Sequence, residues 1–173
     1  MIRQKINKGK KMTHSNKHAI LQNLPGVDHL LELAKQNAEF IDIPRSVIID
    51  SLRNALGNIR KNILRIAHSS KGPHTGTALS CVDILSVLYF DTLNIKSFDD
   101  ENRDIFILSK GHGAMALFVV LHKCGFISDE QLNSYSKFGS ILGGHPDVTK
   151  VPGVEASTGS LGHGLSFSIG IAL

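Results

Sequence analysis

The stretch Asp104-Ile-Phe-Ile-Leu-Ser-Lys-Gly-His112-Gly113 is where the chain changes character, because a short apolar run ends in polar residues and a histidine between two glycines. Residues 105–108 are expected to form a buried strand. The apolar residues 114–125 that follow are long enough for a helix, with Gly125 as its C-terminal stop. Open α/β sheets build ligand sites where a strand turns through glycines into a helix, because the helix N-terminus offers unpaired N–H groups. The sequence therefore places His112 where a ligand would bind.

Upstream of this stretch the pattern is helical. Pro44 suits the first turn of a helix. Six apolar residues then recur at spacings of three or four, which places them on one helical face: Ile48, Leu52, Leu56, Ile59, Ile63 and Ile66. A shorter amphipathic helix is expected over residues 27–40, with its apolar positions at Leu30, Leu31, Leu33, Ala34 and Ala38.

Turn residues and capping signals define the remaining helices. The glycines and proline of residues 68–76 predict a turn, and residues 78–90 a further helix. Ser128 and Gln131 form a capping box, with Ile127 and Leu132 placed for a hydrophobic staple, and this helix is expected to stop at Gly139. These patterns together predict an α/β fold, a parallel sheet flanked by helices.

Composition limits the classes of function. The chain has 173 residues, 42% of them hydrophobic, which suits one domain or part of a larger one. Six of its 19 Lys and Arg lie in the first 18 residues with no acid among them, so the rest carries 13 bases against 15 acids. We therefore predict a disordered basic tail over residues 1–23, a domain over residues 24–173 and no nucleic-acid partner. Met12 is an alternative start residue.

No apolar run approaches the length of a membrane span or of a secretory signal, so we predict a cytoplasmic protein with no membrane partner. Cys81 and Cys124 lie in apolar surroundings far apart in the sequence and fit no metal spacing. They are expected to be reduced thiols of the core.

Four histidines share a glycine-lined setting: His74, His112, His145 and His163. They are tens of residues apart, without paired ligand spacing or clustered cysteines and acids, which disfavours zinc. Imidazoles that hydrogen-bond the hydroxyls, carbonyls or phosphate oxygens of a ligand fit this pattern better.

Four motifs in this order resemble the N-terminal part of transketolase: Gly-Pro-His74-Thr-Gly-Thr-Ala-Leu, Ile-Leu-Ser-Lys-Gly-His112-Gly, Gly-Gly-His145-Pro and Val-Pro-Gly-Val-Glu155-Ala-Ser-Thr-Gly159-Ser-Leu161-Gly-His-Gly164. The resemblance runs from Leu52 to Leu173. The long lead over residues 1–50, and Ser160 where many full-length transketolases carry proline, look more like the N-terminal subunit of split transketolases.

The resemblance implies a transferase of carbohydrate metabolism that uses thiamine diphosphate to move a two-carbon ketol unit between sugar phosphates. It implies that His74 contacts the donor sugar and assists proton transfer, and that His145 hydrogen-bonds a donor hydroxyl. His112 would lie near the cofactor diphosphate. Gly159, Ser160 and Leu161 would form the loop that packs against the aminopyrimidine of the cofactor. For Glu155, a structural carboxylate and a functional one remain equally open.

The family also has parts that residues 1–173 lack. Its Gly-Asp-Gly motif and a downstream Asn hold the divalent metal, Mg²⁺ or Ca²⁺, so metal ligands are expected beyond residue 173 and none within it. Its activating glutamate lies on a pyrimidine-binding domain, which implies a partner subunit, with a homodimer or heterotetramer when complete. We therefore expect an incomplete thiamine-diphosphate-binding domain that is inactive alone.

Two alternatives stay open. One is another thiamine diphosphate enzyme, such as deoxyxylulose-phosphate synthase, although the Ser-Lys-Gly-His turn and the motif spacing argue against it. The other is a non-catalytic binding module that kept part of the fold. The sequence does not define the donor and acceptor sugars.

Overall fold

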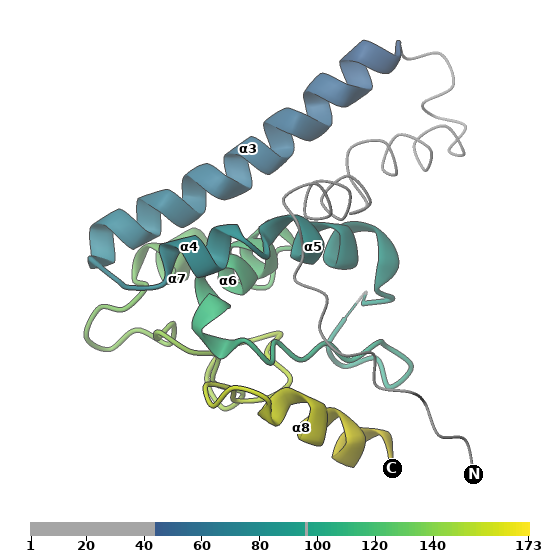
Figure 1. The fold of residues 1–173 in the computed structure, drawn as a ribbon, viewed down its shortest axis with the longest axis vertical. Helices are drawn as coiled ribbons and strands as arrows, with labels where there is room; N and C mark the ends of the chain where they lie inside the picture. The colour runs from purple at the N-terminus through teal and green to yellow at the C-terminus, as the bar shows by residue number, and fades with distance from the viewer. Residues whose placement is uncertain (1–43, 96) are drawn as a thin grey trace, which may run out of the picture.

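The computed structural model describes residues 44–95 and 97–173. The predicted basic tail, its boundary at residue 24 and the predicted helix over residues 27–40 lie outside the described residues. Figure 1 shows the long helix α3 along one side of the molecule and α8 at the opposite end. The helices are α3 (Arg45–Ser70), α4 (Thr75–Leu79), α5 (Val82–Val87), the π-helix η2 (Leu88–Thr92), the 3₁₀-helix η3 (Gly111–Gly113), α6 (Ala114–Lys123), α7 (Asp129–Asn133) and α8 (His163–Ala172).

The core is built around α6. Eight consecutive residues of this helix, 114–121, are buried, as expected for a helix that is apolar on all sides. Contacts with α3, α4, α5, α7 and η3 surround it. The apolar stripe of α3 supplies Ile59, Ile63 and Ile66 to the same core, which confirms the predicted helix and its buried face.

Two predicted helix ends are confirmed in detail. Gly125 ends α6 with φ +86°, and its N–H donates to the His122 carbonyl while that of Phe126 donates to the Leu121 carbonyl. This pair of hydrogen bonds is a Schellman motif, which satisfies carbonyls at the helix end. At the start of α7, the Ser128 side chain accepts from the Gln131 N–H while the Gln131 side chain accepts from the Ser128 N–H, forming the predicted capping box.

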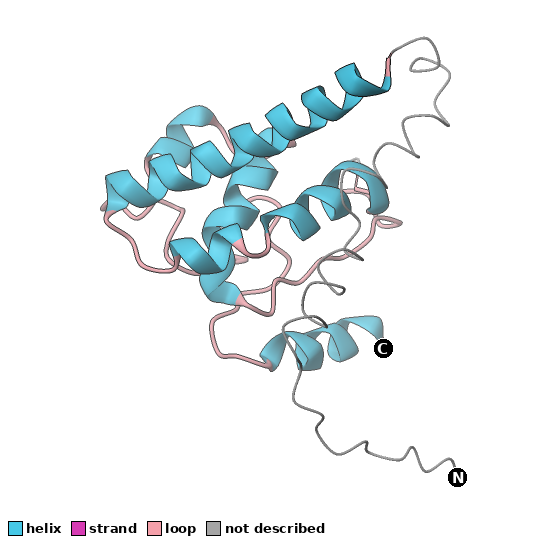
Figure 2. Cartoon of the chain, turned by 45° about the horizontal axis from the view of Figure 1, so that its top comes forward, coloured by secondary structure: helices cyan, strands magenta, loops and turns pink. Residues whose placement is uncertain are grey.

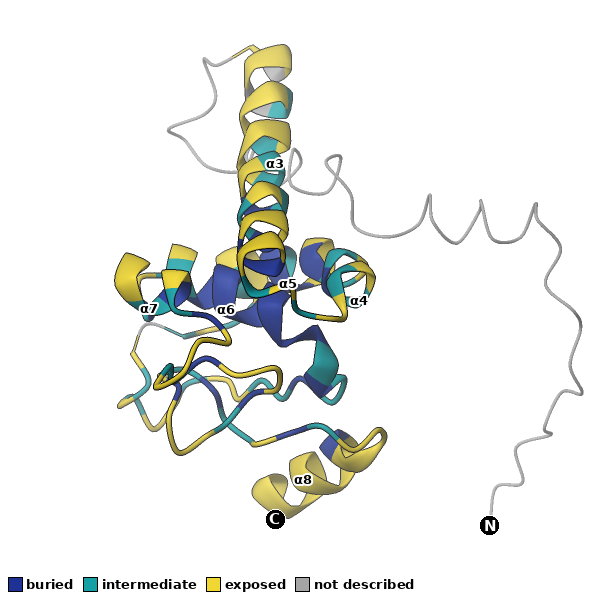
Figure 3. Ribbon diagram, turned by 90° about the vertical axis from the view of Figure 1, so that its left-hand side faces the viewer, coloured by how far each residue is buried: buried dark blue, intermediate teal, exposed yellow. Residues whose placement is uncertain are grey.

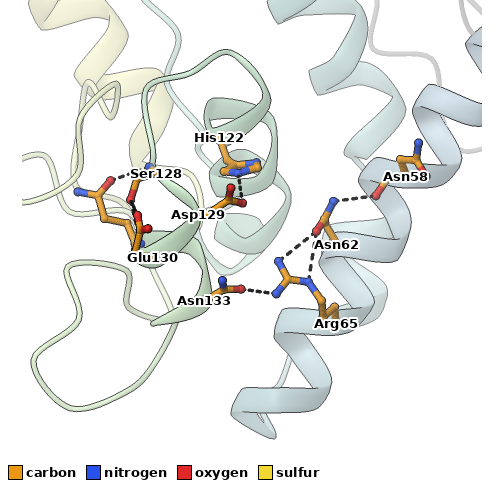
Figure 4. A network of polar contacts seen from close by, with 9 residues as sticks. Asn58, Asn62, Arg65, His122, Ser128, Asp129, Glu130 and Asn133 are labelled. Atoms are coloured by element: carbon orange, nitrogen blue, oxygen red, sulfur yellow. Dashed lines mark hydrogen bonds and ion pairs between the residues drawn. The ribbon is translucent and has the colours of Figure 1, made fainter.

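Polar contacts fix α7 against the core helices (Figure 4). Arg65 of α3 donates hydrogen bonds to Asn62 on its own helix and to Asn133 of α7. The His122 ring of α6 lies 2.9 Å from Asp129 of α7. The helix ends at Asn133, well before the predicted stop at Gly139, because Ser134 takes the C-cap and its hydroxyl donates back to the Gln131 carbonyl.

The predicted helix over residues 78–90 is split into α4, α5 and η2. In a continuous α-helix the Thr77 carbonyl would accept from the Cys81 N–H, but that N–H donates to the Ala78 carbonyl instead. The Thr77 carbonyl accepts from the Ser80 hydroxyl at 2.8 Å and from the Lys110 amine at 3.2 Å. Competing side-chain donors therefore interrupt the helix.

The predicted strand over residues 105–108 is not formed. Among residues 44–95 and 97–173 no segment is a strand, as Figure 2 shows, so the predicted parallel sheet is not confirmed. A strand needs a neighbour to pair its backbone N–H and C=O groups. Here the Leu108 carbonyl accepts from the Thr158 hydroxyl at 2.7 Å, and Ile105 is exposed. The apolar run therefore packs as an irregular segment.

Burial is uneven along the chain (Figure 3). The C-terminal half of α3 is packed, while its N-terminal half extends past the other helices. Gly164 is the one buried residue of α8. Cys81 and Cys124 are free and half-buried, in agreement with their prediction as unpaired thiols. No helix in the described ranges has the length and apolarity needed to cross a membrane.

Candidate functional site

Three of the four glycine-flanked histidines lie together. The His74 ring centroid is 5.3 Å from that of His112 and 6.5 Å from that of His145. These residues come from the start of α4, from η3 and from the loop between α7 and α8. His74 and His145 are exposed, and His112 is half-buried. His163 begins α8 instead, and its ring is paired with that of Phe167, the two ring centroids being 6.4 Å apart.

The turn that carries His74 has two residues with an uncommon, left-handed backbone conformation. His74 has φ 74° at the N-cap of α4, and Lys71, the C-cap of α3, has φ 51°. Residues with a Cβ rarely adopt this left-handed conformation, which costs about 1–2 kcal/mol for each residue. Such strain persists where the surroundings impose it, and often at functional sites. The turn therefore supports a role for His74 beyond connecting two helices.

Residues 108–111, at the end of the apolar stretch, contact the loop over residues 158–164 at three points. Thr158 donates to the Leu108 carbonyl, and the Gly164 N–H donates to the Ser109 hydroxyl at 3.2 Å. A Cβ added at Gly111 would lie 2.5 Å from the Thr158 carbonyl oxygen, and one added at Gly164 would lie 2.3 Å from Ser109 Cβ. Glycine is needed at Gly111 because it meets the backbone of Thr158 and Gly159, and at Gly164 because it meets Cβ and the hydroxyl of Ser109.

This contact places the predicted cofactor loop beside the histidines. A Cβ added at Gly159 would lie 3.3 Å from Cδ2 of His145, so the two residues are in contact. Ser160 and Leu161 follow in an exposed turn, and the Leu161 side chain is 72% exposed. The loops that carry His145 and Gly159 are therefore neighbours, while the Leu161 side chain is not part of the core.

Lys110 links two of the histidine-bearing segments. Its amine donates to the Thr77 carbonyl at 3.2 Å and to the Ser80 hydroxyl at 2.8 Å, both at the end of α4. His74 begins this short helix, and His112 lies two residues beyond Lys110. Lys110 and Thr158 both lie inside the motifs, but neither was predicted to have a role. Their partners are 33 and 50 residues away, which no local pattern indicates.

The cluster favours neutral imidazole at His112. Partial burial lowers the pKa of His112, and the nearby His74, Lys110 and His145 lower it further by charge repulsion. A neutral imidazole both donates and accepts a hydrogen bond, as proton transfer and hydroxyl recognition require.

Glu155 is accounted for by an ion pair. Arg103 donates two hydrogen bonds to its carboxylate, both at 3.0 Å, and the two side chains are only 19% and 13% exposed. Such a bidentate pair joins residues 52 positions apart. Of the two interpretations of Glu155, the structure supports the structural one.

A resident metal has no evident ligand set in residues 44–95 and 97–173, where no three His, Cys, Asp or Glu side chains gather closely enough to hold an ion. Three rings meet beside a glycine loop with exposed backbone.

A family model described as transketolase, thiamine diphosphate binding domain, matches residues 52–173. The chain belongs to this family. The match includes the segments that carry the three clustered histidines and the loop at Gly159, so the predicted resemblance is confirmed. A second model, described as selenocysteine synthase N terminal, matches residues 21–60, a short segment that ends within α3.

Curated relatives of this transketolase-family chain include single subunits of apulose-4-phosphate transketolases. The subunit from Phocaeicola vulgatus is 45% identical over 116 residues, which is 66% of this chain and 41% of that protein. Its counterpart from Actinobacillus succinogenes is 43% identical over 133 residues, covering 75% of this chain and 48% of that protein. The chain thus spans less than half the length of either relative.

A solved transketolase from Leishmania mexicana has a similar fold, with a TM-score of 0.64 and 31% identity over 69% of this chain and 18% of that one. This likeness confirms a transketolase-like fold for the described part of the chain.

Proposed function

We propose that this chain supplies the diphosphate-binding part of a thiamine diphosphate-dependent transketolase, which moves a two-carbon ketol unit between sugar phosphates. The observation that carries the proposal is the convergence of His74, His112 and His145 beside Gly159. Relatives that are named as subunits of apulose-4-phosphate transketolases support two further parts of it, sugar phosphates as substrates and a second chain as partner. The chain would be inactive without that partner.

The described residues suit the cofactor. The turn at Ser160 and Leu161 is exposed next to the close contact between Gly111 and Thr158, and these two residues with Gly159 would pack against the aminopyrimidine. His112, held neutral by its surroundings, would donate a hydrogen bond to the diphosphate end. Thiamine diphosphate, when bound, supplies the carbon nucleophile and the sink for the developing carbanion.

The other two rings would act on the sugar. His74 is exposed and 5.3 Å from His112, so it would face the donor sugar and move a proton to or from a hydroxyl. His145 would orient a donor hydroxyl by a hydrogen bond. Both roles need an imidazole that can accept and donate hydrogen bonds. Separate segments of the chain hold the two rings near each other.

A pyrimidine-binding partner subunit, together with a homodimeric or heterotetrameric assembly and a cytoplasmic location, is part of the same proposal. The divalent cation, Mg²⁺ or Ca²⁺, would be bound by residues beyond residue 173. Of the alternatives, a deoxyxylulose-phosphate synthase is disfavoured because the relatives reported above are transketolases. The other alternative is a non-catalytic binding module, which ketol-transfer activity of the assembled protein would exclude.

The test is His74→Ala in the chain assembled with its pyrimidine-domain partner. Loss of a general acid–base group should lower ketol transfer by roughly one to three orders of magnitude, while thiamine diphosphate affinity stays nearly constant. His112→Ala should weaken cofactor binding as well as rate. Steady-state kinetics and calorimetric titration of the cofactor measure the two effects.

His68→Ala is the matched control, since His68 is an exposed histidine in the last turn of α3 outside the cluster. It should leave rate and cofactor affinity unchanged. Abolished cofactor binding in His74→Ala, or undiminished ketol transfer, would show that the role assigned to His74 is wrong.

A further inference from the structure

A short loop between Thr158 and the start of α8 is tied to the chain at both of its ends. The buried Thr158 hydroxyl donates to the Leu108 carbonyl at 2.7 Å, and the Gly164 N–H donates to the Ser109 hydroxyl at 3.2 Å. The two acceptors belong to adjacent residues, 50 and 55 positions upstream of their donors. The loop over residues 159–163 is therefore held at its base by a single short segment of the chain.

The same loop closes on itself. The His163 N–H donates to the Ser160 carbonyl at 3.5 Å, and Gly162 between them has φ 88° and ψ −16°. These angles suit the third residue of a type II turn, where glycine is favoured. Leu161 takes the second position of the turn, and its side chain is 72% exposed. An apolar side chain is thus presented to solvent by a backbone of defined shape.

Ser109 also acts as the N-terminal cap of α8. The helix begins after Gly162, which has no side chain that could accept from the N–H groups of the first turn. Gly164 lies in that turn, and its N–H donates to the Ser109 hydroxyl instead. A Cβ added at Gly164 would lie 2.3 Å from Ser109 Cβ, so the two residues are also packed together. Ser109 therefore fixes the point at which the loop ends and the helix begins.

The position of this loop matters for the histidine cluster. Gly159 follows Thr158 directly and contacts the His145 ring, because a Cβ added there would lie 3.3 Å from Cδ2 of that ring. Gly111 packs against Thr158 and Gly159, one residue before His112. If either hydrogen bond at the base of the loop were lost, the turn would be free to move away from these rings. Ligand binding would then have to order the loop again, and that entropic cost lowers affinity.

We propose that Ser109 and Thr158 are positioning residues for the cofactor. Their hydroxyls hold the turn over residues 159–163 beside the histidines before thiamine diphosphate binds, so the cofactor meets a surface that is already formed. The inference rests on the proposed function, in which this turn packs against the aminopyrimidine. Neither hydroxyl needs to touch the cofactor, because each acts through the loop end that it holds.

Hydrogen exchange on the full chain tests the two hydrogen bonds in the absence of cofactor. Thr158→Val keeps the shape of the buried side chain but removes the donor to Leu108. The amides of His163 and Gly164 lie at the other end of the loop, and they should exchange at least about tenfold faster in this variant because the loop opens more often. Thr158→Ser keeps the hydroxyl and should restore slow exchange. The amides of α6 report whether each variant stays folded.

Cofactor binding tests what the fixed loop does. In the chain assembled with its pyrimidine-domain partner, calorimetric titration should show an affinity for thiamine diphosphate about tenfold lower in Thr158→Val. The kcat at saturating cofactor should stay within about twofold of the unmodified protein, because a loss of binding alone leaves the chemical step intact. Ser109→Ala keeps the Cβ that packs on Gly164 and should lower the affinity in the same way. It decides the matter if Thr158→Val disrupts α6.

Ser168→Ala is the matched control. The Ser168 hydroxyl donates to the Gly164 carbonyl at 2.8 Å within α8, so this hydrogen bond ties no end of the loop to another segment. Exchange and cofactor affinity should both be unchanged in this variant. Unchanged exchange of His163 and Gly164 in Thr158→Val, or faster exchange with unchanged cofactor affinity, would overturn the proposal. An unmodified assembly that binds no thiamine diphosphate would instead overturn the proposed function, whatever the exchange shows.

Discussion

At the scale of single residues, the site depends on the absence of side chains as much as on the histidines. The segment around Gly111 meets the loop at Thr158 so closely that a methyl group has no room. Interiors are packed at crystal-like density, so the backbone itself must shift if a Cβ is added.

Replacing Gly111 by Ala should therefore destabilise the chain by about 1–3 kcal/mol, because the new Cβ would overlap the Thr158 carbonyl and Gly159 N. Chemical denaturation measures this loss. Gly57→Ala is the control with the opposite sign, since Gly57 lies inside α3 with no atom within 4 Å of an added Cβ. Alanine there should stabilise the helix by about 0.5–1 kcal/mol. An equal effect of the two substitutions would contradict the crowding argument.

A second residue-scale prediction concerns Tyr89. Its hydroxyl is buried and makes no hydrogen bond within the described part of the chain, and burial raises the pKa of this phenol. A buried polar group without a partner costs about 1–3 kcal/mol. Tyr89→Phe should therefore raise the free energy of unfolding, measured in urea, by up to about 1 kcal/mol. The gain is smaller than the cost of the unpaired hydroxyl because the packing contacts of its oxygen are lost as well.

The chain's other tyrosine provides the comparison. Tyr135 is buried too, but its hydroxyl is not among the buried groups without a partner. Tyr135→Phe should give no gain in stability. Destabilisation by Tyr89→Phe would mean that its hydroxyl has a hydrogen-bond partner in solution.

At the scale of elements, local signals predicted helix ends better than helix continuity. The capping box at Ser128 and the stop at Gly125 depend on residues within a few positions, so the sequence alone contains them. The break between α4 and α5 depends on Lys110, which binds the Thr77 carbonyl from 33 residues away. A donor so distant in sequence cannot be inferred from the apolar pattern of residues 78–90.

Lys110→Met tests how this contact supports the site. The variant loses two hydrogen bonds to the end of α4, so we expect a stability loss of about 1–2 kcal/mol. The positive charge of Lys110 lowers the pKa of His112, so its removal should raise that pKa. An NMR titration of the imidazoles measures the direction directly.

Lys137→Met is the control for this titration, because Lys137 is exposed and does not contribute to the shift at His112. It should leave both stability and the His112 pKa unchanged. A fall in the His112 pKa on replacing Lys110 would refute the proposed electrostatic contact.

At the scale of the whole molecule, the sequence singled out the glycine-lined turns whose histidines lie together, but it did not predict the secondary structure between them. Three histidines expected in a ligand site do meet, because their glycine-lined turns allow close approach. The strand expected at residues 105–108 does not form, because an apolar run specifies burial and leaves its pairing partner undefined. Burial of Leu108 is achieved here by contacts with the core and a hydrogen bond from Thr158.

The last prediction concerns α8, which lies apart from the helices around α6 (Figure 1). Leu165 is 71% exposed, Phe167 43% and Ile169 54%, so the helix presents apolar side chains to water. Contiguous apolar surface of this kind drives association. The chain alone should therefore self-associate as its concentration rises, and Leu165→Gln with Ile169→Gln should shift sedimentation toward the monomer. Phe138→Ser, at an isolated and fully exposed position, should not. A chain that stays monomeric at every concentration would show that α8 is covered in solution by the chain itself.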